Sequence, residues 1–209
     1  MEKIDLKKEL KQFYKISSKS PEIVDVPEFK FLKIDGEIEK GKEPGNSTNF
    51  EKSVEALYAT AYTIKFACKK NETNPIDFVV MPLEGLWDLK DKSIDEKVKD
   101  NWKFTLMILM PDFVTNDLFL NSQKIAFEKK GNLFIKNIRF ENFNEGLSVQ
   151  MLHIGAYADE PKTVDKMKSL TREKGFDFIQ SHHEIYLSDP RKSDPEKLKT
   201  GLRYQIKKR

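Results

Sequence analysis

The sequence predicts an α+β protein built as one duplicated domain, and three observations support this class. Segments with apolar residues at every second position, the period of a strand, alternate with segments whose apolar residues recur every three or four positions, the period of a helix. Their order is strand, helix, strand, strand, then an inserted helix, then strand, helix, strand, strand, which repeats an architecture rather than residues. A chain of 209 residues is ordinary in length for one duplicated domain.

The first half of the domain is expected at about 22–114, after a leader segment at 1–21. Thr48 and Glu51 form a capping box, which satisfies free backbone amides at the start of a helix that runs to about Lys70. The other elements expected here are a short leader helix carrying Leu6, Leu10 and Phe13, strands at 24–34, 76–82 and 102–110, and a connection between the last two strands that carries Trp87.

The second half is expected at about 132–209, so that the whole domain covers 22–209, with a helix at about 116–130 inserted between the halves. Gly131 is suited to end the inserted helix, and Pro161 lies early in the next one, where its missing amide costs nothing. The remaining elements are expected at 134–154 as an extended segment interrupted near 144–146, around His183 as a strand, after Asp194 as a helix of one or two turns, and at 202–206 as the last strand.

The strand around His183 carries the most informative pattern of the chain. Alternation sends Ile185 and Leu187 to one face, and Glu184 and Tyr186 to the other. A carboxylate beside a phenol suits a concave site for flat aromatic or cationic molecules. From the pattern alone, a half-buried strand with a solvated glutamate is the commoner outcome.

Composition excludes several classes of function. The chain has 37 basic and 34 acidic residues, and this near balance argues against a dedicated nucleic-acid binder, which needs a clustered basic face. The longest apolar run, 104–110, is far shorter than the roughly 20 residues that span a bilayer, and the charged N-terminus has no apolar signal region. Cys68 is the single cysteine, so an internal disulfide is impossible. We expect a soluble, cytoplasmic protein with no direct nucleic-acid or membrane partner, and its oligomeric state stays open.

The histidines do not predict a metal site. His182 and His183 are adjacent, so on a strand they point in opposite directions. No histidine or cysteine pair has the spacing of a zinc site, and no glycine-rich phosphate loop is present. The sequence therefore predicts neither a metal nor a cofactor.

Four blocks cover most of the chain from about Val26 onward: PLEGLW at 82–87, WKFTLMILMPDFVT at 102–115, VQMLHIGAYADEPKTV at 149–164 and EIYLSDPRKSDPEKLKTGLR at 184–203. Together they resemble the GyrI-like small-molecule-binding family, and in particular a stand-alone branch of it. The resemblance implies that the two halves join into one curved antiparallel sheet, with helices on the convex face and a ligand cleft on the concave face. Some members of this branch are cyclopropanoid cyclopropyl hydrolases, which open the strained ring of DNA-alkylating natural products.

The resemblance also implies roles for individual residues. It places a functional glutamate at Glu184, which in an aromatic cleft could take a proton from water as a general base or attract a ligand cation. Trp102 and Tyr62 are explained about as well by core or helix packing, whereas Trp87 fits an aromatic cage more firmly. His153 shares a face with Tyr157 if the strand remains regular. The candidate ligand-binding residues are Trp87, Trp102, Tyr157, Tyr186, Tyr62 and His153.

Three functions follow from this interpretation. The first is hydrolysis of a flat electrophile that carries an activated cyclopropane, such as a xenobiotic alkylating agent. The second is sequestration of cationic aromatic compounds without turnover, by cation–π attraction and a carboxylate counter-ion. The third is a ligand-sensing or gyrase-inhibitor-like regulator. It is disfavoured because a leader of roughly 20 residues is too short for a helix-turn-helix domain.

Overall fold

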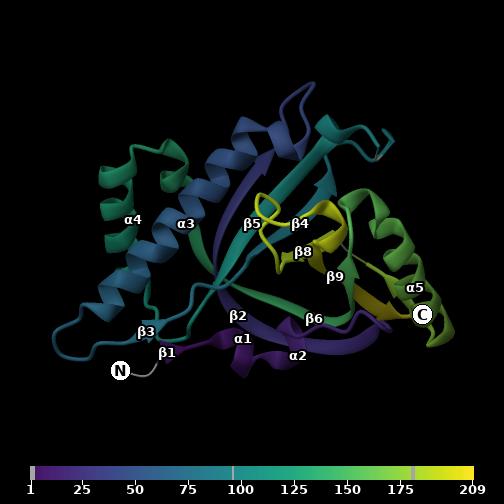
Figure 1. The fold of residues 1–209 in the computed structure, drawn as a ribbon, viewed down its shortest axis with the longest axis horizontal. Coiled ribbons are helices and arrows are strands. Elements are labelled where there is room, and N and C mark those ends of the chain that lie inside the picture. The colour runs from purple at the N-terminus through teal and green to yellow at the C-terminus, as the bar shows by residue number, and fades with distance from the viewer. Residues whose placement is uncertain (1–2, 96, 180–181) are drawn as a thin grey trace. The chain divides into compact units, whose positions relative to one another are not determined.

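The computed structural model describes residues 3–95, 97–179 and 182–209 (Figure 1). The chain divides into two compact units. The fold is α+β with a mostly antiparallel sheet, as the sequence predicts. Apart from a two-residue parallel pair, the strand pairs whose registers the structure gives are antiparallel. Unit 1 comprises Met1–Leu6, Phe29–Met81 and Trp87–Phe143, and unit 2 comprises Lys7–Glu28, Pro82–Leu86 and Asn144–Arg209.

Three long or central strands contribute to both units: β2 (Glu22–Glu37), β4 (Leu83–Leu89) and β6 (Arg139–Ile154). The division therefore cuts through strands rather than through linkers. The predicted halves at about 22–114 and 132–209, and the convex and concave faces of the sheet, stay predictions.

Unit 1 is organised around two helices and a strand pair. Its elements are β1 (Lys3–Ile4), α3 (Thr48–Lys69), β3 (Asp77–Phe78), β5 (Trp102–Met110), α4 (Asn116–Lys130), the later parts of β2 and β4, and the first part of β6. Strand β5 pairs with β2 from Lys30↔Met110 to Glu37↔Lys103. Helix α3 buries Leu57, Ala61 and Ile64 completely, which accounts for the apolar stripe of its sequence.

The helix ends of unit 1 follow local signals. Helix α4 has the predicted bounds, because the Thr115 side chain accepts a hydrogen bond from the amide of Leu118 and Gly131 adopts a left-handed conformation with φ 64°. The predicted cap of α3 is wrong by one residue. Ser47, not Thr48, is the N-cap, and its hydroxyl accepts from the amide of Phe50.

Two predicted elements of unit 1 need correction. The strand expected at 76–82 is reduced to Asp77–Phe78, and the next strand begins after Pro82. Proline lacks the amide that a strand ladder requires, so it separates the two segments. Trp87 consequently lies within β4 rather than on a connection.

Unit 2 combines helices and strands around an apolar core of its own. Its elements are α2 (Lys11–Tyr14), α5 (Glu160–Glu173), β7 (Phe176–Phe178), β8 (His182–Tyr186) and β9 (Lys199–Lys208), with parts of the shared strands and most of α1 (Leu6–Glu9). Strand β9 pairs with β6, β7 and β8. The apolar core of the unit consists of Val149, Met151, Val164, Met167, Leu202 and Ile206.

The second half also departs from expectation in detail. The segment predicted as extended from 134 begins with a 3-10 helix at Leu133–Asn137. Strand β6 then runs through the expected interruption, where Gly146 has φ 66° and lets the backbone continue in a left-handed conformation. Strand β7 was not predicted, because three residues are too few for a periodic signal. The leader helix is divided into α1 and α2.

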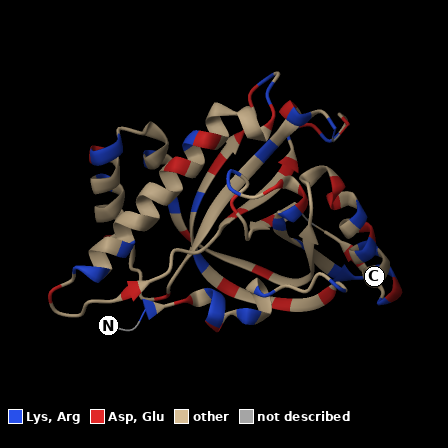
Figure 2. Ribbon diagram, viewed as in Figure 1, with Lys and Arg blue, Asp and Glu red and all other residues tan. Residues whose placement is uncertain are grey.

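Helices α3 and α5 both contain basic and acidic residues (Figure 2). In the part of the chain that the structure describes, no helix is long and apolar enough to cross a membrane.

Candidate functional site

Strand β8 presents two different faces within unit 2. His183 and Ile185 are 1% and 0% exposed, whereas His182, Glu184 and Tyr186 on the other face are half-buried. The alternation predicted for this strand is therefore observed. The two faces lead to two separate groups of ionisable side chains.

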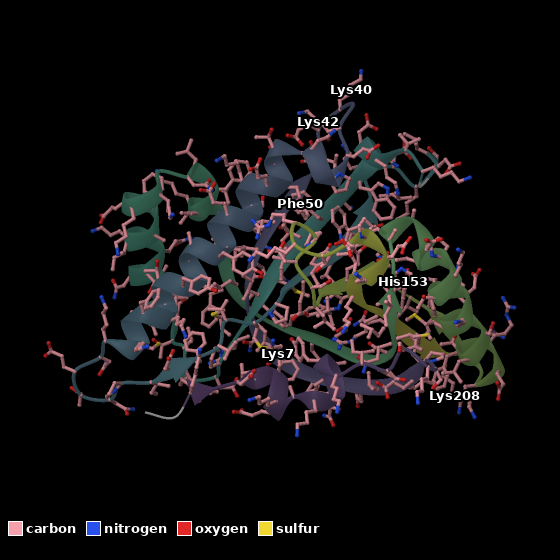
Figure 3. All side chains as sticks on the ribbon, viewed as in Figure 1. Lys7, Lys40, Lys42, Phe50, His153 and Lys208 are labelled. Atoms are coloured by element: carbon pink, nitrogen blue, oxygen red, sulfur yellow. The ribbon has the colours of Figure 1, made fainter. Side chains whose placement is uncertain are left out.

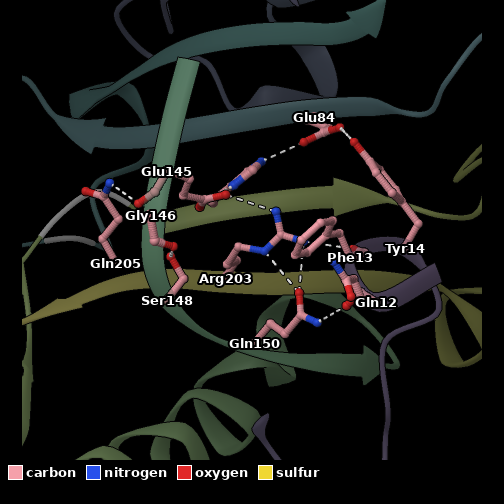
Figure 4. A network of polar contacts seen from close by, with 11 residues as sticks. Gln12, Phe13, Tyr14, Glu84, Glu145, Gly146, Ser148, Gln150, Arg203 and Gln205 are labelled. Atoms are coloured by element: carbon pink, nitrogen blue, oxygen red, sulfur yellow. Dashed lines mark hydrogen bonds and ion pairs between the residues drawn. The ribbon is translucent and has the colours of Figure 1, made fainter. Parts of the chain in front are cut away.

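The first group is a fully buried network around His183 (Figure 4). Its Nδ1 lies 2.8 Å from Glu145 Oε1, and its Nε2 lies 3.0 Å from Glu84 Oε2. Arg203 donates from Nη1 to Glu145 Oε2 at 2.9 Å, and the Tyr14 hydroxyl donates to Glu84 Oε1 at 2.6 Å. The network joins α2, β4, β6, β8 and β9.

Arg203 also ties the leader to this network. Its Nε and Nη2 donate to Gln150 Oε1 at 3.1 and 2.9 Å, and Nη2 donates to the carbonyl oxygen of Phe13 at 2.8 Å. The Gln150 amide in turn donates to the carbonyl oxygen of Gln12 at 2.7 Å (Figure 4). The segment predicted as a leader is thus hydrogen-bonded into the interior of unit 2.

The charges of this network compensate each other. Burial opposes protonation of His183, but the carboxylates of Glu145 and Glu84 outweigh it and raise the pKa of His183 to about 9. Burial also opposes ionisation of Glu145, but His183 and Arg203 lower the pKa of that carboxyl to about 2. Burial, followed by the charge of Glu84, raises the pKa of Tyr14 well above its usual value. Two cations therefore face two carboxylates, an arrangement that supports structure rather than turnover.

The second group lies on the opposite face of β8. His182 Nε2 lies 2.8 Å from Glu184 Oε1 and 3.3 Å from Glu160 Oε2. Its Nδ1 makes a short hydrogen bond with the hydroxyl of Tyr204. Burial opposes protonation of His182, but the hydrogen bonds and charges of Glu160 and Glu184 outweigh it and raise the pKa of His182 to about 9.

Two phenols accompany this carboxylate pair. The rings of Tyr157 and Tyr186 lie 6.4 Å apart at 88°, an edge-to-face contact. Burial, then the negative charges of Glu184 and Glu160, raise the pKa of Tyr157 to about 12, so its hydroxyl stays protonated and can donate. The structure thus brings three of the predicted residues, Glu184, Tyr157 and Tyr186, into one neighbourhood.

His153 is placed differently from the prediction. Strand β6 ends at Ile154, and Gly155 has φ 139°, so the regular strand that would align His153 with Tyr157 stops before it reaches Tyr157. His153 is buried in unit 2 (Figure 3). Its Nδ1 lies 2.9 Å from Thr163 Oγ1, and its Nε2 lies 3.1 Å from the carbonyl oxygen of Ala156. Both ring nitrogens are therefore engaged within the chain.

The predicted tryptophans belong to unit 1, where they form one aromatic cluster. Trp87 is 6% exposed and contacts the ring of Trp102 edge-on at 6.2 Å. Phe50, on α3 (Figure 3), stacks on Trp87 at 5.6 Å, and Phe104 contacts it edge-on at 5.7 Å. Tyr62 is also in unit 1, half-exposed in a row of aromatic rings along α3 with Tyr58 and Phe66.

One group has the donor types of a metal site. Glu160, His182 and Glu184 offer ligand atoms that all lie within 4.8 Å of one another. One imidazole nitrogen with two carboxylate oxygens is compatible with zinc or a similar divalent ion. Sequence spacing could not reveal this group, because Glu160 comes from α5 and the two other residues from β8. The 2.8 Å contact between His182 and Glu184 is a direct hydrogen bond.

Comparisons with known proteins identify the family of this chain. A model of the GyrI-like small molecule binding domain matches residues 19–207. An uncharacterized conserved protein from Listeria innocua is 41% identical, with a TM-score of 0.89 over 98% of this chain and 100% of its own. Two structures described as hydrolases from Listeria innocua are each 39% identical, with TM-scores of 0.88 and 0.85 over 99% and 98% of this chain and all of theirs. A search of curated proteins found no match. The chain belongs to the family of GyrI-like small-molecule-binding domains.

Proposed function

We propose that this protein binds flat xenobiotics and hydrolyses the cyclopropyl ring of DNA-alkylating compounds. The observation that carries the proposal is the position of Glu184. It is a half-buried carboxylate whose Oε1 is held by His182 beside two tyrosines. The two Listeria innocua proteins described as hydrolases, which align with almost the whole chain, favour turnover over binding alone.

The proposed reaction needs one base and one hydrogen-bond donor. Glu184 takes a proton from a water molecule, and the water oxygen attacks the methylene carbon of the cyclopropane. The ring bond to the conjugated system breaks, and its electron pair moves onto the carbonyl oxygen. Tyr186 or Tyr62 donates to that developing oxyanion, which takes up one proton from solvent while Glu184 returns its proton to solvent. The net change is addition of water, and ring strain supplies the driving force without a cofactor.

The binding part of the proposal uses aromatic rings. Flat substrates would stack on members of the predicted set, which excludes bulk water and fixes orientation. We also propose that these residues line a ligand cleft on the concave face of the sheet, which the two halves of the domain would form together. The proposed ligand-binding residues are Trp87, Trp102, Tyr157, Tyr186, Tyr62 and His153.

Sequestration of cationic aromatic compounds is the second candidate function. It is favoured by the two carboxylates, Glu160 and Glu184, that share one histidine near Tyr157. One imidazolium between two carboxylates leaves a net negative charge, which attracts a cation next to the aromatic rings. A ligand-sensing or gyrase-inhibitor-like regulator would use the same attraction as a signal.

Glu184→Gln separates the candidates, because it keeps the shape of the side chain and removes the base and the charge. The rate of hydrolysis of a cyclopropane-bearing alkylating agent is measured from the appearance of the ring-opened product. This rate should fall by about a hundredfold or more if Glu184 is the base. Affinity for a neutral aromatic ligand should change little. If Glu184 is only a counter-ion, cationic ligands lose affinity instead.

The exposed Glu173 at the end of α5 offers a matched control. Glu173→Gln should leave both hydrolysis and binding at the level of the unaltered protein. Unchanged hydrolysis together with unchanged cation affinity in Glu184→Gln would remove Glu184 from both functions.

A further inference from the structure

His182 is the only described residue that hydrogen-bonds to the carboxylate of Glu184. The bond runs from His182 Nε2 to Glu184 Oε1, and no described residue bonds to Oε2. The side chains of His182 and Glu184 are 15% and 13% exposed, so solvent screens this contact only partly. One oxygen of the Glu184 carboxylate is thus anchored by His182.

Three elements of unit 2 fix the orientation of the imidazole. Glu160 from the first turn of α5 approaches Nε2 at 3.3 Å, and Tyr204 from β9 bonds to Nδ1. The Tyr204 ring is itself stacked on Phe178 at 4.5 Å. The histidine therefore has contacts on both ring nitrogens and little freedom to rotate.

The proton on Nε2 follows from its neighbours. Both carboxylates that face Nε2 can only accept hydrogen bonds, so Nε2 carries a hydrogen. Tyr204 can accept as well as donate, so Nδ1 can also be protonated. A hydrogen bond from this N–H to a carboxylate oxygen is stronger than one between two neutral groups.

We propose that His182 is a positioning residue for Glu184: it holds Oε1 so that Oε2 points at the reacting water. The expected effect on kcat rests on the proposed hydrolytic function, whereas the expected effect on the position of the Glu184 carboxylate does not. A base must lie within hydrogen-bond reach of the proton it takes, and a displacement of about 1 Å can cost a factor of about a hundred in rate. Residue 182 lies two positions before 184 on the same strand face, so the contact needs no movement of other elements.

A purely structural role for His182 makes a different prediction. The histidine would then only attach the start of α5 to β8, through Glu160. Its loss would lower the free energy of unfolding and leave turnover of the folded protein unchanged.

The kinetic experiment compares His182→Leu with His182→Gln, whose amide can still donate to Oε1. In His182→Leu, kcat for ring opening should fall by about tenfold or more while KM stays nearly constant. His182→Gln should recover a large part of that loss. Lys162→Ala, which removes an exposed ion pair with Asp159 at the same helix start, should retain full kcat. Equal kcat in the leucine variant and the unaltered protein would overturn the proposal.

A double-mutant cycle with Glu184→Gln tests whether His182 acts through Glu184. If it does, adding His182→Leu to Glu184→Gln should lower kcat no further. Independent, multiplicative losses would contradict the proposal. Each assay is run with a chelator and again with excess Zn²⁺. Turnover that the chelator abolishes and Zn²⁺ restores in the unaltered protein, but not in His182→Leu, would show that the histidine is a metal ligand instead.

A crystal structure of His182→Leu provides a readout that does not depend on turnover. The Glu184 carboxylate should leave the position that it has in the unaltered protein. A carboxylate that keeps its position would overturn the positioning role even if the protein proved to be a hydrolase. If the unaltered protein opened no cyclopropane, the proposed function would fail, and the position of Glu184 in this crystal structure would still decide the inference.

Discussion

His182 and His183 are adjacent and both have a pKa raised to about 9, yet their surroundings differ. His183 is 1% exposed and bonds to carboxylates on two other strands. His182 bonds to a half-buried carboxylate on its own strand, Glu184, and lies 3.3 Å from a buried carboxylate at a helix start, Glu160. Alternation along one strand has thus separated two similar imidazoles into an interior and a boundary environment.

The comparison shows that one type of ion pair, histidine with carboxylate, can serve different purposes according to how deeply it is buried. Every member of the His183 network is buried, so any unpaired charge there would remain without water. Such a network specifies the packing of its strands, and its loss is costly because the partners are left behind. Around His182, solvent can reach the carboxylate, which is the condition for chemistry on a ligand.

The largest expected effect is on stability and tests the buried side of the comparison. Arg203→Met keeps much of the volume but removes a cation that holds Glu145 and the Phe13 carbonyl. The free energy of unfolding, measured with urea, should fall by about 3–5 kcal/mol, the cost of breaking a buried ion pair.

Arg209→Met is the control for this change. It removes a similar side chain whose ion pair with Asp177 is half-exposed. Exposed pairs contribute at most about 1 kcal/mol, so the control should be nearly as stable as the unaltered protein. Equal losses in the two variants would show that the Arg203 network is not the source of the difference.

Alkaline pH should weaken both histidine groups, and His183 more strongly. The folded-state pKa of His183, about 9, lies above its ordinary value of 6.5. Its contribution is therefore fully present below pH 6.5 and is lost as the pH rises through 9. The shift corresponds to roughly 3 kcal/mol, which thermal unfolding between pH 6.5 and 10 would detect.

Two variants assign this pH dependence. His183→Gln should flatten the decline more than His182→Gln, because solvent screens the boundary group in part. If the loss of stability at alkaline pH depended mainly on His182, the boundary histidine rather than the buried one would contribute more to stability.

Local signals explain how much of the fold the sequence could predict. The inserted helix at 116–130 was predicted to the residue, because Thr115 and Gly131 mark its ends with their own chemistry. The strand at 102–110 was equally clear, since it is bounded by Pro111. By contrast, β7 has three residues and no period to detect, and the position of Trp87 within β4 depended on which side of Pro82 the strand began.

The ionic groups could be predicted only in part. Glu184 and Tyr186 were assigned to one face by alternation, which needs no knowledge of other elements. The partners of His183 are 38 and 99 residues away in sequence, and Glu160 reaches His182 from α5. A sequence does not distinguish a buried carboxylate from a surface carboxylate. Burial becomes tolerable only through a charged or hydrogen-bonding partner, and that partner can be distant in the sequence.

The smallest expected effect compares two tyrosine hydroxyls, one on each histidine group. Tyr14 donates to Glu84 inside the buried network, and Tyr204 bonds to His182 at the boundary. Tyr14→Phe leaves the buried Glu84 without one of its two hydrogen bonds, so the free energy of unfolding should fall by about 1–3 kcal/mol. In Tyr204→Phe the ring can remain stacked on Phe178 and water can replace the hydroxyl, so the loss should be about 0.5–1.5 kcal/mol. Urea unfolding of the two variants at neutral pH measures both values. A larger loss in Tyr204→Phe would mean that the His182 group, rather than the His183 network, determines the stability of unit 2.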